Sequence, residues 1–447
     1  MTSLYTKGTI IYKLWKIFSR LFFNQTKPTR KHLFEIILSV LALNGYQSVK
    51  FNYEHFINDI SGSHLNSYYY TLNESKIELS DWMEKMLETA LSIIPEEAEN
   101  QPIIISIDDT MVEKYGEQFE ARRKLFDHAA HNGSYYLNGH CFVSLVVSVP
   151  VIDTSGCHYI SFPITYRMWT KEQSKLDMAS DLVRNVMRVL GSQRQVILCC
   201  DSWYPKASVV RLVDEFVNLA LIANVRSDTA IYELPPESTG RRGRPRVRGN
   251  KISLKDIDLR DIPDSDYLVG AKPVITELFN RRTVYAVVTK SKDRDSRRLF
   301  ICTADPATLN FDPAFAGNSS SSVFSDIDTG FLPLTIYEFR WDIEVSYYEQ
   351  KSFWALEDYM LRSKIGIERL LNLLTIVYSF MTLLPYISDD FYALKSMSRQ
   401  QARFVLGDLV RQQVFLTGFE SYVNQTNNPF DFSDFLVYRF SLLARVA

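Results

Sequence analysis

The chain has 447 residues, a length that corresponds to two or three domains. Its 46% hydrophobic and 23% charged residues are ordinary for a soluble globular protein. The net charge of −2 argues against a uniformly basic nucleic-acid binder, although a local basic patch still binds phosphate. The five cysteines form no CxxC pair, which argues against a disulfide framework and favours a cytoplasmic protein.

Residues 1–98 are expected to form a helical N-terminal domain. Ser80 followed by Asp81 and Glu84 is typical of a helix start, and the apolar residues after it recur at helical spacing. These apolar residues are Met83, Met86, Leu87, Ala90 and Leu91. No secretory signal is recognisable near residue 1. The polar stretch 95–101 marks the expected domain boundary.

From there the pattern changes to short apolar runs that are typical of strands. The expected strands are 102–107, 141–151, 158–166, 195–200 and 219–225. The expected helices are 171–190 and 207–218. This order predicts an α/β fold with a mixed sheet, and residues 99–225 would form the first part of its core.

Residues 226–328 break this alternation. Strands are expected at 282–289 and 297–303, so we interpret the segment as a β-rich insertion. It contains a Gly/Pro/Arg loop, 240–249, without an acidic residue. The arginines of this loop are Arg241, Arg242, Arg244, Arg246 and Arg248. The loop is either a solvated basic segment or an arm that lies in the minor groove of DNA, and we favour DNA contact.

The rest of the chain is expected to be helical. Helices are predicted at 337–351, 365–386 and 398–416. Residues 329–390 would close the core, and 391–447 would form a C-terminal helical region. The uncharged stretch 370–387 is interrupted by polar residues, so a buried core helix is favoured over a membrane span.

Three carboxylates stand at positions that favour metal binding. Asp108 ends the strand 102–107, Asp201 ends the strand 195–200, and Glu344 lies on the helix after the insertion. A single strand-end Asp is more often a turn residue or a helix cap. Three together suit two Mg²⁺ ions, which take oxygen ligands and catalyse phosphoryl transfer as a pair.

The third carboxylate belongs to a polar stripe. Tyr337, Arg340, Glu344 and Lys351 are spaced so that they lie within roughly 60° of one another on a continuous helix. The stripe is either a salt-bridged solvent face, in which Arg340 and Glu344 are an i,i+4 pair, or a metal ligand among groups that hold phosphate.

These motifs resemble the DDE transposases of bacterial insertion sequences, in the group with a Tyr-Arg-Glu-Lys signature. The matching residues are Asp108-Asp109-Thr110, Asp201-Ser202-Trp203-Tyr204 and the stripe from Tyr337 to Lys351. The resemblance implies a ribonuclease-H-like core interrupted by a β insertion before the last acid. It also implies that the protein cuts DNA at element ends and joins them to target DNA, with two Mg²⁺ or Mn²⁺ ions.

The resemblance assigns roles to individual residues. Asp108, Asp201 and Glu344 would be the catalytic metal ligands, although Asp109 remains an alternative to Asp108. Strand alternation favours Asp108 only weakly. Tyr337 and Arg340 would hold phosphate at the element end, and Lys351 would contact the DNA backbone nearby.

The expected partner is double-stranded DNA, both the terminal inverted repeats of the element and the target DNA. A second copy of the chain is expected in the DNA complex, and no membrane is expected. Residues 1–98 would take part in DNA binding. Two alternatives stay open: a catalytically silent DNA-binding protein derived from a transposase, and a metal-dependent nuclease without strand transfer. Some relatives form a DNA hairpin with a base stacked on a tryptophan of the insertion; no tryptophan occurs in 226–328, so the hairpin step stays open.

Overall fold

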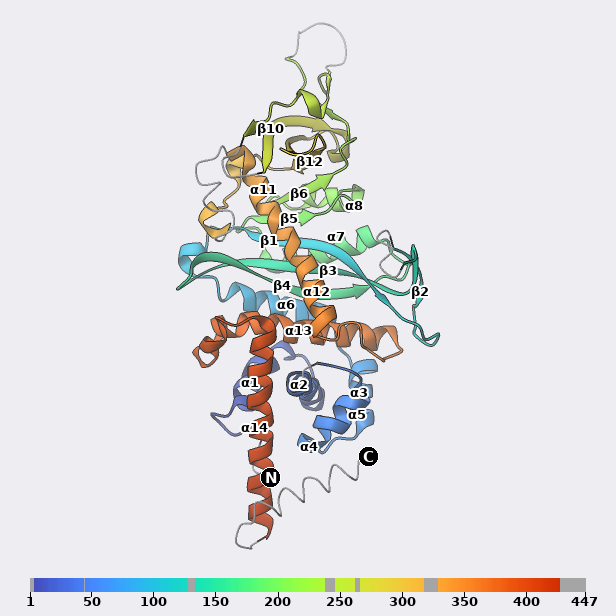
Figure 1. Cartoon of the computed structure of the whole chain (residues 1–447), viewed down its shortest axis with the longest axis vertical. Helices are drawn as coiled ribbons and strands as arrows, with labels where there is room; N and C mark the ends of the chain where they lie inside the picture. The colour runs from blue at the N-terminus through green and yellow to red at the C-terminus, as the bar shows by residue number, and fades with distance from the viewer. Residues whose placement is uncertain are drawn as a thin grey trace. The chain divides into compact units, whose positions relative to one another are not determined.

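The structure is a computed structural model, and it describes residues 4–43, 45–127, 133–237, 246–261, 266–316 and 329–426. The chain divides into two compact units. The first comprises Met1–Met86, Val112–Gly139 and Tyr348–Ala447, and the second comprises Leu87–Met111 and His140–Tyr347. Figure 1 shows their helices and strands.

The first unit is mainly helical. Its N-terminal helices are α1 (Ile10–Leu21), α2 (Lys27–Ala42), α3 (Val49–Asn52), the π-helix η1 (Tyr53–Ile57), α4 (Asn58–Ile60), α5 (Leu65–Asn73) and most of α6 (Leu79–Leu91). Its C-terminal helices are α13 (Lys364–Ile387), η9 (Asp389–Leu394) and α14 (Arg399–Thr426). The short strand β2 (Arg123–Phe126) also belongs to it. The N-terminal segment is helical, and a separate domain over residues 1–98 stays a prediction.

The core of the first unit forms around α2 and α13. Thr26 and Ser363 cap the starts of these helices by accepting backbone N–H groups. Helix α2 packs against α1, α5, α13 and α14. In the described part of the chain, α13 is the one helix long and apolar enough to cross a membrane, and 83% of its most apolar window is buried inside the protein. Such burial is typical of a core helix.

The second unit contains a large mixed sheet. Its strands are β1 (Ile103–Glu113), β3 (Tyr136–Asp153), β4 (Gly156–Met168), β5 (Val196–Cys200), β6 (Leu219–Val225), β7 (Ile231–Tyr232), β8 (Lys251–Ile252), β9 (Arg260–Asp261), β10 (Tyr267–Thr276), β11 (Thr283–Ser291) and β12 (Arg297–Cys302). The strand order is β3-β1-β5-β6-β12-β11-β10-β7-β8, with β4 paired to β3 and β9 to β10. The mixed α/β fold expected from the sequence is confirmed.

The centre of this sheet is parallel. Strand β1 pairs in parallel with β5, and β5 pairs in parallel with β6. Their β-branched and apolar side chains are buried, as is usual for strands covered on both faces. The strands after residue 226 join this sheet. Strand β12 pairs antiparallel with β6, β11 pairs antiparallel with β12, and β10 pairs antiparallel with β11.

Helices cover the sheet. They are α7 (Lys175–Leu190), α8 (Ala207–Val210), α9 (Leu212–Glu215), α11 (Leu332–Tyr337) and the first part of α12 (Trp341–Phe353). Short 3₁₀ turns join other segments: η2 (Glu96–Ala98), η3 (Leu254–Asp256), η4 (Glu277–Phe279), η5 (Pro306–Thr308), η6 (Pro313–Ala316), η7 (Thr329–Phe331) and η8 (Glu338–Arg340). Ile336 of α11 packs in one core cluster with Ile104, Ile197 and Ile222 of the sheet.

The single helix predicted for 337–351 is wrong in one respect. The segment consists of the end of α11, the 3₁₀ turn η8 and most of α12. A 3₁₀ turn is wound more tightly than an α-helix, so it shifts the angular positions of the residues that follow. Here Phe339 packs against the cluster around Ile336, and the carbonyl of Phe339 accepts a 3.4 Å hydrogen bond from Ser106 Oγ of β1. The predicted helix 207–218 is likewise shorter and divided into α8 and α9.

Candidate active site

Two aspartates lie at the same level, directly after the last pair of β1 with β5. The register of β1 and β5 pairs Ile107 with Cys200, so the next residues, Asp108 and Asp201, lie at matching positions. One oxygen of each carboxylate accepts a backbone hydrogen bond nearby. The N–H of Asp109 donates to Asp108 at 2.8 Å, and that of Trp203 donates to Asp201 at 3.0 Å.

The electrostatics of this pair favour a bound cation. Burial, and then the negative charges of Asp201 and Asp109, raise the pKa of Asp108 to about 8. Burial also raises the pKa of Asp201. Two neighbouring carboxylates repel each other when both are ionised, and a cation that lies between them makes their ionised forms favourable. The oxygen donors of Asp108 and Asp201 therefore fit a hard divalent metal ion.

Asp109 lies in a different environment from Asp108. Its Oδ2 is 2.6 Å from the ammonium of Lys175 and accepts a 3.2 Å hydrogen bond from the thiol of Cys141. Its Oδ1 accepts a 3.1 Å hydrogen bond from the hydroxyl of Tyr204. Both oxygens thus have protein partners, which favours Asp108 over Asp109 as the metal ligand.

Arg340 is the cation that faces the acidic residues. Its guanidinium makes a 2.7 Å ion pair with Glu344, and its positive charge partly offsets the burial that raises the pKa values of Asp108 and Asp201. Only 12% of the Arg340 side chain is exposed, against 38% for Glu344. Glu344 is therefore the more exposed residue of the Arg340–Glu344 ion pair.

The sheet holds the helix that carries Glu344. Asp342 of α12 accepts a hydrogen bond from Ser161 of β4. Tyr347 of the same helix shares a 2.6 Å hydrogen bond with Ser144 of β3. These contacts flank Glu344 on both sides along the helix and fix its backbone relative to the strands.

Asp108, Asp201 and Glu344 are not gathered into one metal centre. Among the residues that the structure describes, no group of three His, Cys, Asp or Glu side chains is close enough to hold a metal ion. The two half-buried aspartates form one part of the candidate site, and the carboxylate of Glu344 is paired with Arg340 instead. Glu344 as a third ligand stays a prediction.

Tyr337 and Lys351 have partners within the protein. The hydroxyl of Tyr337 donates a 3.3 Å hydrogen bond to the carbonyl of Cys200, and its ring packs edge-on against Phe300 at 5.0 Å. Lys351 belongs to the first unit, where it forms a 2.8 Å ion pair with Glu357. Their contact with DNA is untested and stays a prediction.

The basic loop is described only in part. Arg241, Arg242 and Arg244 lie outside the described residues. Arg246 is exposed. Arg248 forms an ion pair with Glu277, and its guanidinium lies 3.9 Å from the centroid of the Tyr232 ring. Arg248 therefore anchors the end of the loop.

The sequence analysis assigned no role to Lys175, Cys141 or Tyr204, the residues that surround Asp109. Tyr204 follows Asp201 within the Asp-Ser-Trp-Tyr motif, which was the one available signal. Lys175 is 66 residues from Asp109 in the chain, and no sequence pattern indicates their contact.

The family model described as DDE superfamily endonuclease matches residues 23–266, which is more than half of the chain. The matched range contains Asp108 and Asp201 and ends before Glu344. No curated protein matches the chain. One similar solved structure is titled "Drosophila P element transposase strand transfer complex", with 11% identity, coverage of 85% of this chain and 90% of that chain, and a TM-score of 0.23. No conclusion about fold or function follows from a similarity at this TM-score.

Proposed function

Since this chain belongs to the DDE superfamily of endonucleases, we propose that it is a DNA transposase of the Tyr-Arg-Glu-Lys group. It would cut the ends of an insertion sequence and join them to target DNA. The observation that carries the proposal is that Asp108 and Asp201 follow Ile107 and Cys200, the last paired residues at the carboxyl end of the parallel β1–β5 ladder. Functional groups of α/β sheets collect at these carboxyl ends. The mixed sheet is consistent with a ribonuclease-H-like core.

The acidic residues suit phosphoryl transfer. Asp108, Asp201 and Glu344 would hold two Mg²⁺ or Mn²⁺ ions, which activate an attacking oxygen and stabilise the leaving oxygen. The fit rests on the two half-buried aspartates, since the charge of Asp201 contributes to the raised pKa of Asp108. A bound cation would relieve this repulsion.

Arg340 would change partners when DNA binds. It now pairs with Glu344, which lies one helical turn further along the chain. A scissile phosphate offers the guanidinium two oxygens in the geometry it prefers. Pairing with phosphate would release the Glu344 carboxylate, which is then able to join Asp108 and Asp201.

The partners follow from the same proposal. The protein would bind double-stranded DNA at terminal inverted repeats and at the target, with residues 1–98, Tyr337, Lys351 and the basic loop contributing contacts. It would act as a homodimer in the DNA complex and work in the cytoplasm on the nucleoid. Trp203, which is 38% exposed and two residues from Asp201, lies next to the expected path of the DNA.

The test is a joining reaction. Purified protein is incubated with labelled duplexes that carry the ends of its own element, supercoiled target DNA and Mg²⁺. A transposase releases 3′ ends and yields target molecules with joined ends. Cleavage without joining would indicate a nuclease, and binding without cleavage would indicate a silent descendant. Asp201→Asn and a chelator provide the negative controls.

A further inference from the structure

We propose that Asp109, Tyr204 and Lys175 form a clamp that sets the distance between Asp108 and Asp201. This inference rests on the proposed function, because it concerns how the same site holds its metal ions. The three residues are positioning residues and do not touch the metal themselves. We call them the Asp109 clamp.

The need for a clamp arises from where β5 ends. Strand β5 stops at Cys200, and its last pair with β1 is Ile107 with Cys200. Asp108 still lies within β1, which continues to Glu113. Asp201 lies outside the ladder, in the loop between β5 and α8. The position of its carboxylate therefore depends on what holds that loop.

The Asp109 clamp holds the loop from the strand side. Tyr204, three residues after Asp201, donates its hydroxyl to Oδ1 of Asp109 at 3.1 Å. Lys175, the first residue of α7, lies 2.6 Å from Oδ2 of the same carboxylate. Tyr204 is 1% exposed, so its hydroxyl would lose a partner in a buried place if the contact broke. One carboxylate adjacent to Asp108 thus fixes both the Asp201 loop and the start of α7.

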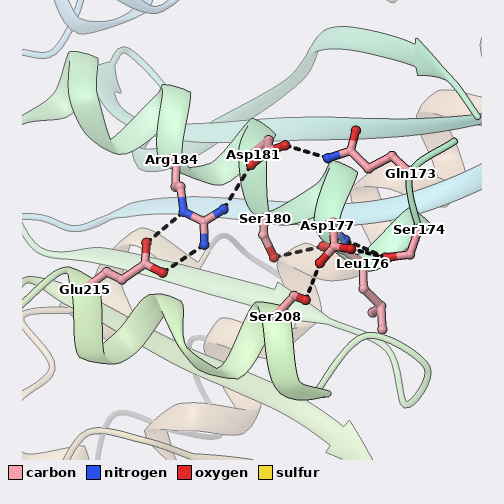
Figure 2. A network of polar contacts seen from close by, with 9 residues as sticks. All are labelled: Gln173, Ser174, Leu176, Asp177, Ser180, Asp181, Arg184, Ser208 and Glu215. Atoms are coloured by element: carbon pink, nitrogen blue, oxygen red, sulfur yellow. Dashed lines mark hydrogen bonds and ion pairs between the residues drawn. The ribbon is translucent and has the colours of Figure 1, made fainter.

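A second set of contacts joins α7 to the start of α8, and Figure 2 shows Ser174, Asp177 and Ser208 side by side. Ser174 caps α7 by accepting the N–H of Asp177 at 3.1 Å. The carboxylate of Asp177 accepts a hydrogen bond from Ser208 in the first turn of α8. Since α8 follows the Asp201 loop directly, the loop is held at Tyr204 by Asp109, and the helix that follows it is held at Ser208 by α7.

Helix α7 is also attached to α9 further along its length. The guanidinium of Arg184 makes two hydrogen bonds to Glu215 of α9, at 2.7 and 2.8 Å, and one to Asp181 at 2.9 Å (Figure 2). Exposed ion pairs contribute little stability one by one, but a bidentate pair defines an orientation. Lys175 therefore presents its ammonium to Asp109 from a helix that is held along its length.

The test is a measurement of Mn²⁺ binding to the full chain, with and without DNA duplex, from the electron paramagnetic resonance signal of free Mn²⁺. Tyr204→Phe removes the hydroxyl that contacts Asp109 and keeps the ring. Residues that orient metal ligands typically contribute about 10–100-fold in affinity. We expect Tyr204→Phe to weaken Mn²⁺ binding about 10-fold while the thermal unfolding midpoint changes little.

A matched control is available in the same unit. Tyr285 donates its hydroxyl to Asp305 at 2.7 Å, away from the two aspartates in the chain. Tyr285→Phe removes a comparable hydrogen bond and should leave Mn²⁺ affinity unchanged. Asp109→Asn keeps an acceptor for Tyr204 and loses the charge that pairs with Lys175, so it should weaken binding without abolishing it.

The outcomes separate the clamp from the proposed function. Wild-type Mn²⁺ affinity in Tyr204→Phe would overturn the clamp. If Asp109→Asn then also lost Mn²⁺ binding completely, Asp109 would be a metal ligand. Equal binding by Asp108→Asn and wild type, or no binding by wild type, would instead overturn the metal site itself and the clamp with it.

Discussion

The guanidinium of Arg340 lies 2.7 Å from the carboxylate of Glu344, and the same positive charge partly offsets the burial that raises the pKa values of Asp108 and Asp201. One arginine therefore interacts with every carboxylate of the candidate site. Its Nε is buried and has no hydrogen-bond partner among the described residues. This unused donor is consistent with a ligand that completes the arginine's contacts, as a DNA phosphate would.

Arg340→Lys should impair cleavage although it keeps the charge. A lysine offers one point charge and cannot make the planar two-point contact of a guanidinium with phosphate. We expect single-turnover cleavage to slow at least about 10-fold, the loss that corresponds to roughly 1.4 kcal/mol of transition-state stabilisation. Arg226→Lys, at an exposed ion pair with Asp228, is the matched control. Equal cleavage rates in the Arg340 variant and wild type would reduce Arg340 to an ion-pair partner of Glu344.

The basic loop should contribute salt-dependent DNA affinity. Replacing Arg241, Arg242, Arg244 and Arg246 by Gln leaves Arg248, which anchors the loop through Glu277. If about three of these four arginines bind DNA phosphates, the plot of the logarithm of the binding constant against the logarithm of salt concentration should become shallower by roughly 2–3, at about 0.9 per phosphate. The measurement is a salt titration of binding on A·T-rich and mixed duplexes. A larger loss on A·T-rich DNA would indicate minor-groove contact, and unchanged slopes on both would show that the loop is only solvated.

Glu35 should make the stability of the first unit depend on pH. The residue is 0% exposed, and its Oε2 accepts a 2.7 Å hydrogen bond from Tyr68. Burial raises the pKa of Glu35 above its ordinary 4.5, so the folded state holds this proton more tightly than the unfolded state does. The resulting stabilisation is complete below pH 4.5 and is lost as the pH rises through the folded-state pKa.

Glu35→Gln removes this titration and keeps an acceptor for Tyr68. Relative to wild type, the variant should gain stability as the pH rises from 4.5 towards neutrality, by on the order of 1 kcal/mol. The measurement is the urea midpoint at several pH values. Glu54→Gln, at an exposed ion pair with Lys50, should show no comparable trend. A parallel pH dependence in Glu35→Gln and wild type would contradict the prediction.

Gly270→Ala should destabilise the second unit. A Cβ at this position of β10 would lie 2.2 Å from the carbonyl oxygen of Asp258, a backbone atom that cannot move aside cheaply. Overpacking of this kind costs about 1–3 kcal/mol. The expected result is a lower unfolding midpoint, whereas Gly62→Ala, where nothing lies within 4 Å, should be close to neutral. An unchanged midpoint in Gly270→Ala would show that β10 shifts to accommodate the methyl group.

The central strands could be predicted because buried parallel strands are read from continuous apolar runs. The runs at Ile103–Ile107 and Val196–Cys200 are both followed by an acid. The strand end predicted before Asp201 is confirmed, whereas the one predicted before Asp108 is wrong, because β1 continues to Glu113. Strand β10 was missed because it contains Gly270 and Pro273, residues that are depleted in strand interiors. Its place in the sheet is fixed by pairing with β11, a tertiary interaction that local sequence does not show.

The sequence was sufficient to predict the acidic residues of the candidate site, but not the residues that surround them. The choice of Asp108 over Asp109 depended on the Asp-x-Thr pattern of the resembling family, with weak support from strand alternation, whereas the structure adds the contacts of Asp109 with Lys175 and Tyr204. The stripe from Tyr337 to Lys351 assumed a continuous α-helix, and the 3₁₀ turn η8 interrupts it. Turns of this kind follow from how Phe339 packs on the sheet, which spacing alone does not reveal.

The most direct test of the account is Mg²⁺-dependent release of 3′ ends from a labelled element-end duplex by wild type, Asp201→Asn and Glu344→Gln. Asp228→Asn, at the exposed pair with Arg226, is the carboxylate control. We predict cleavage by wild type and the control, background levels in the other two, and similar DNA binding by all four proteins. Full cleavage by Glu344→Gln or Asp201→Asn in Mg²⁺, with binding unchanged, would contradict the central claim that these carboxylates hold the catalytic metal ions.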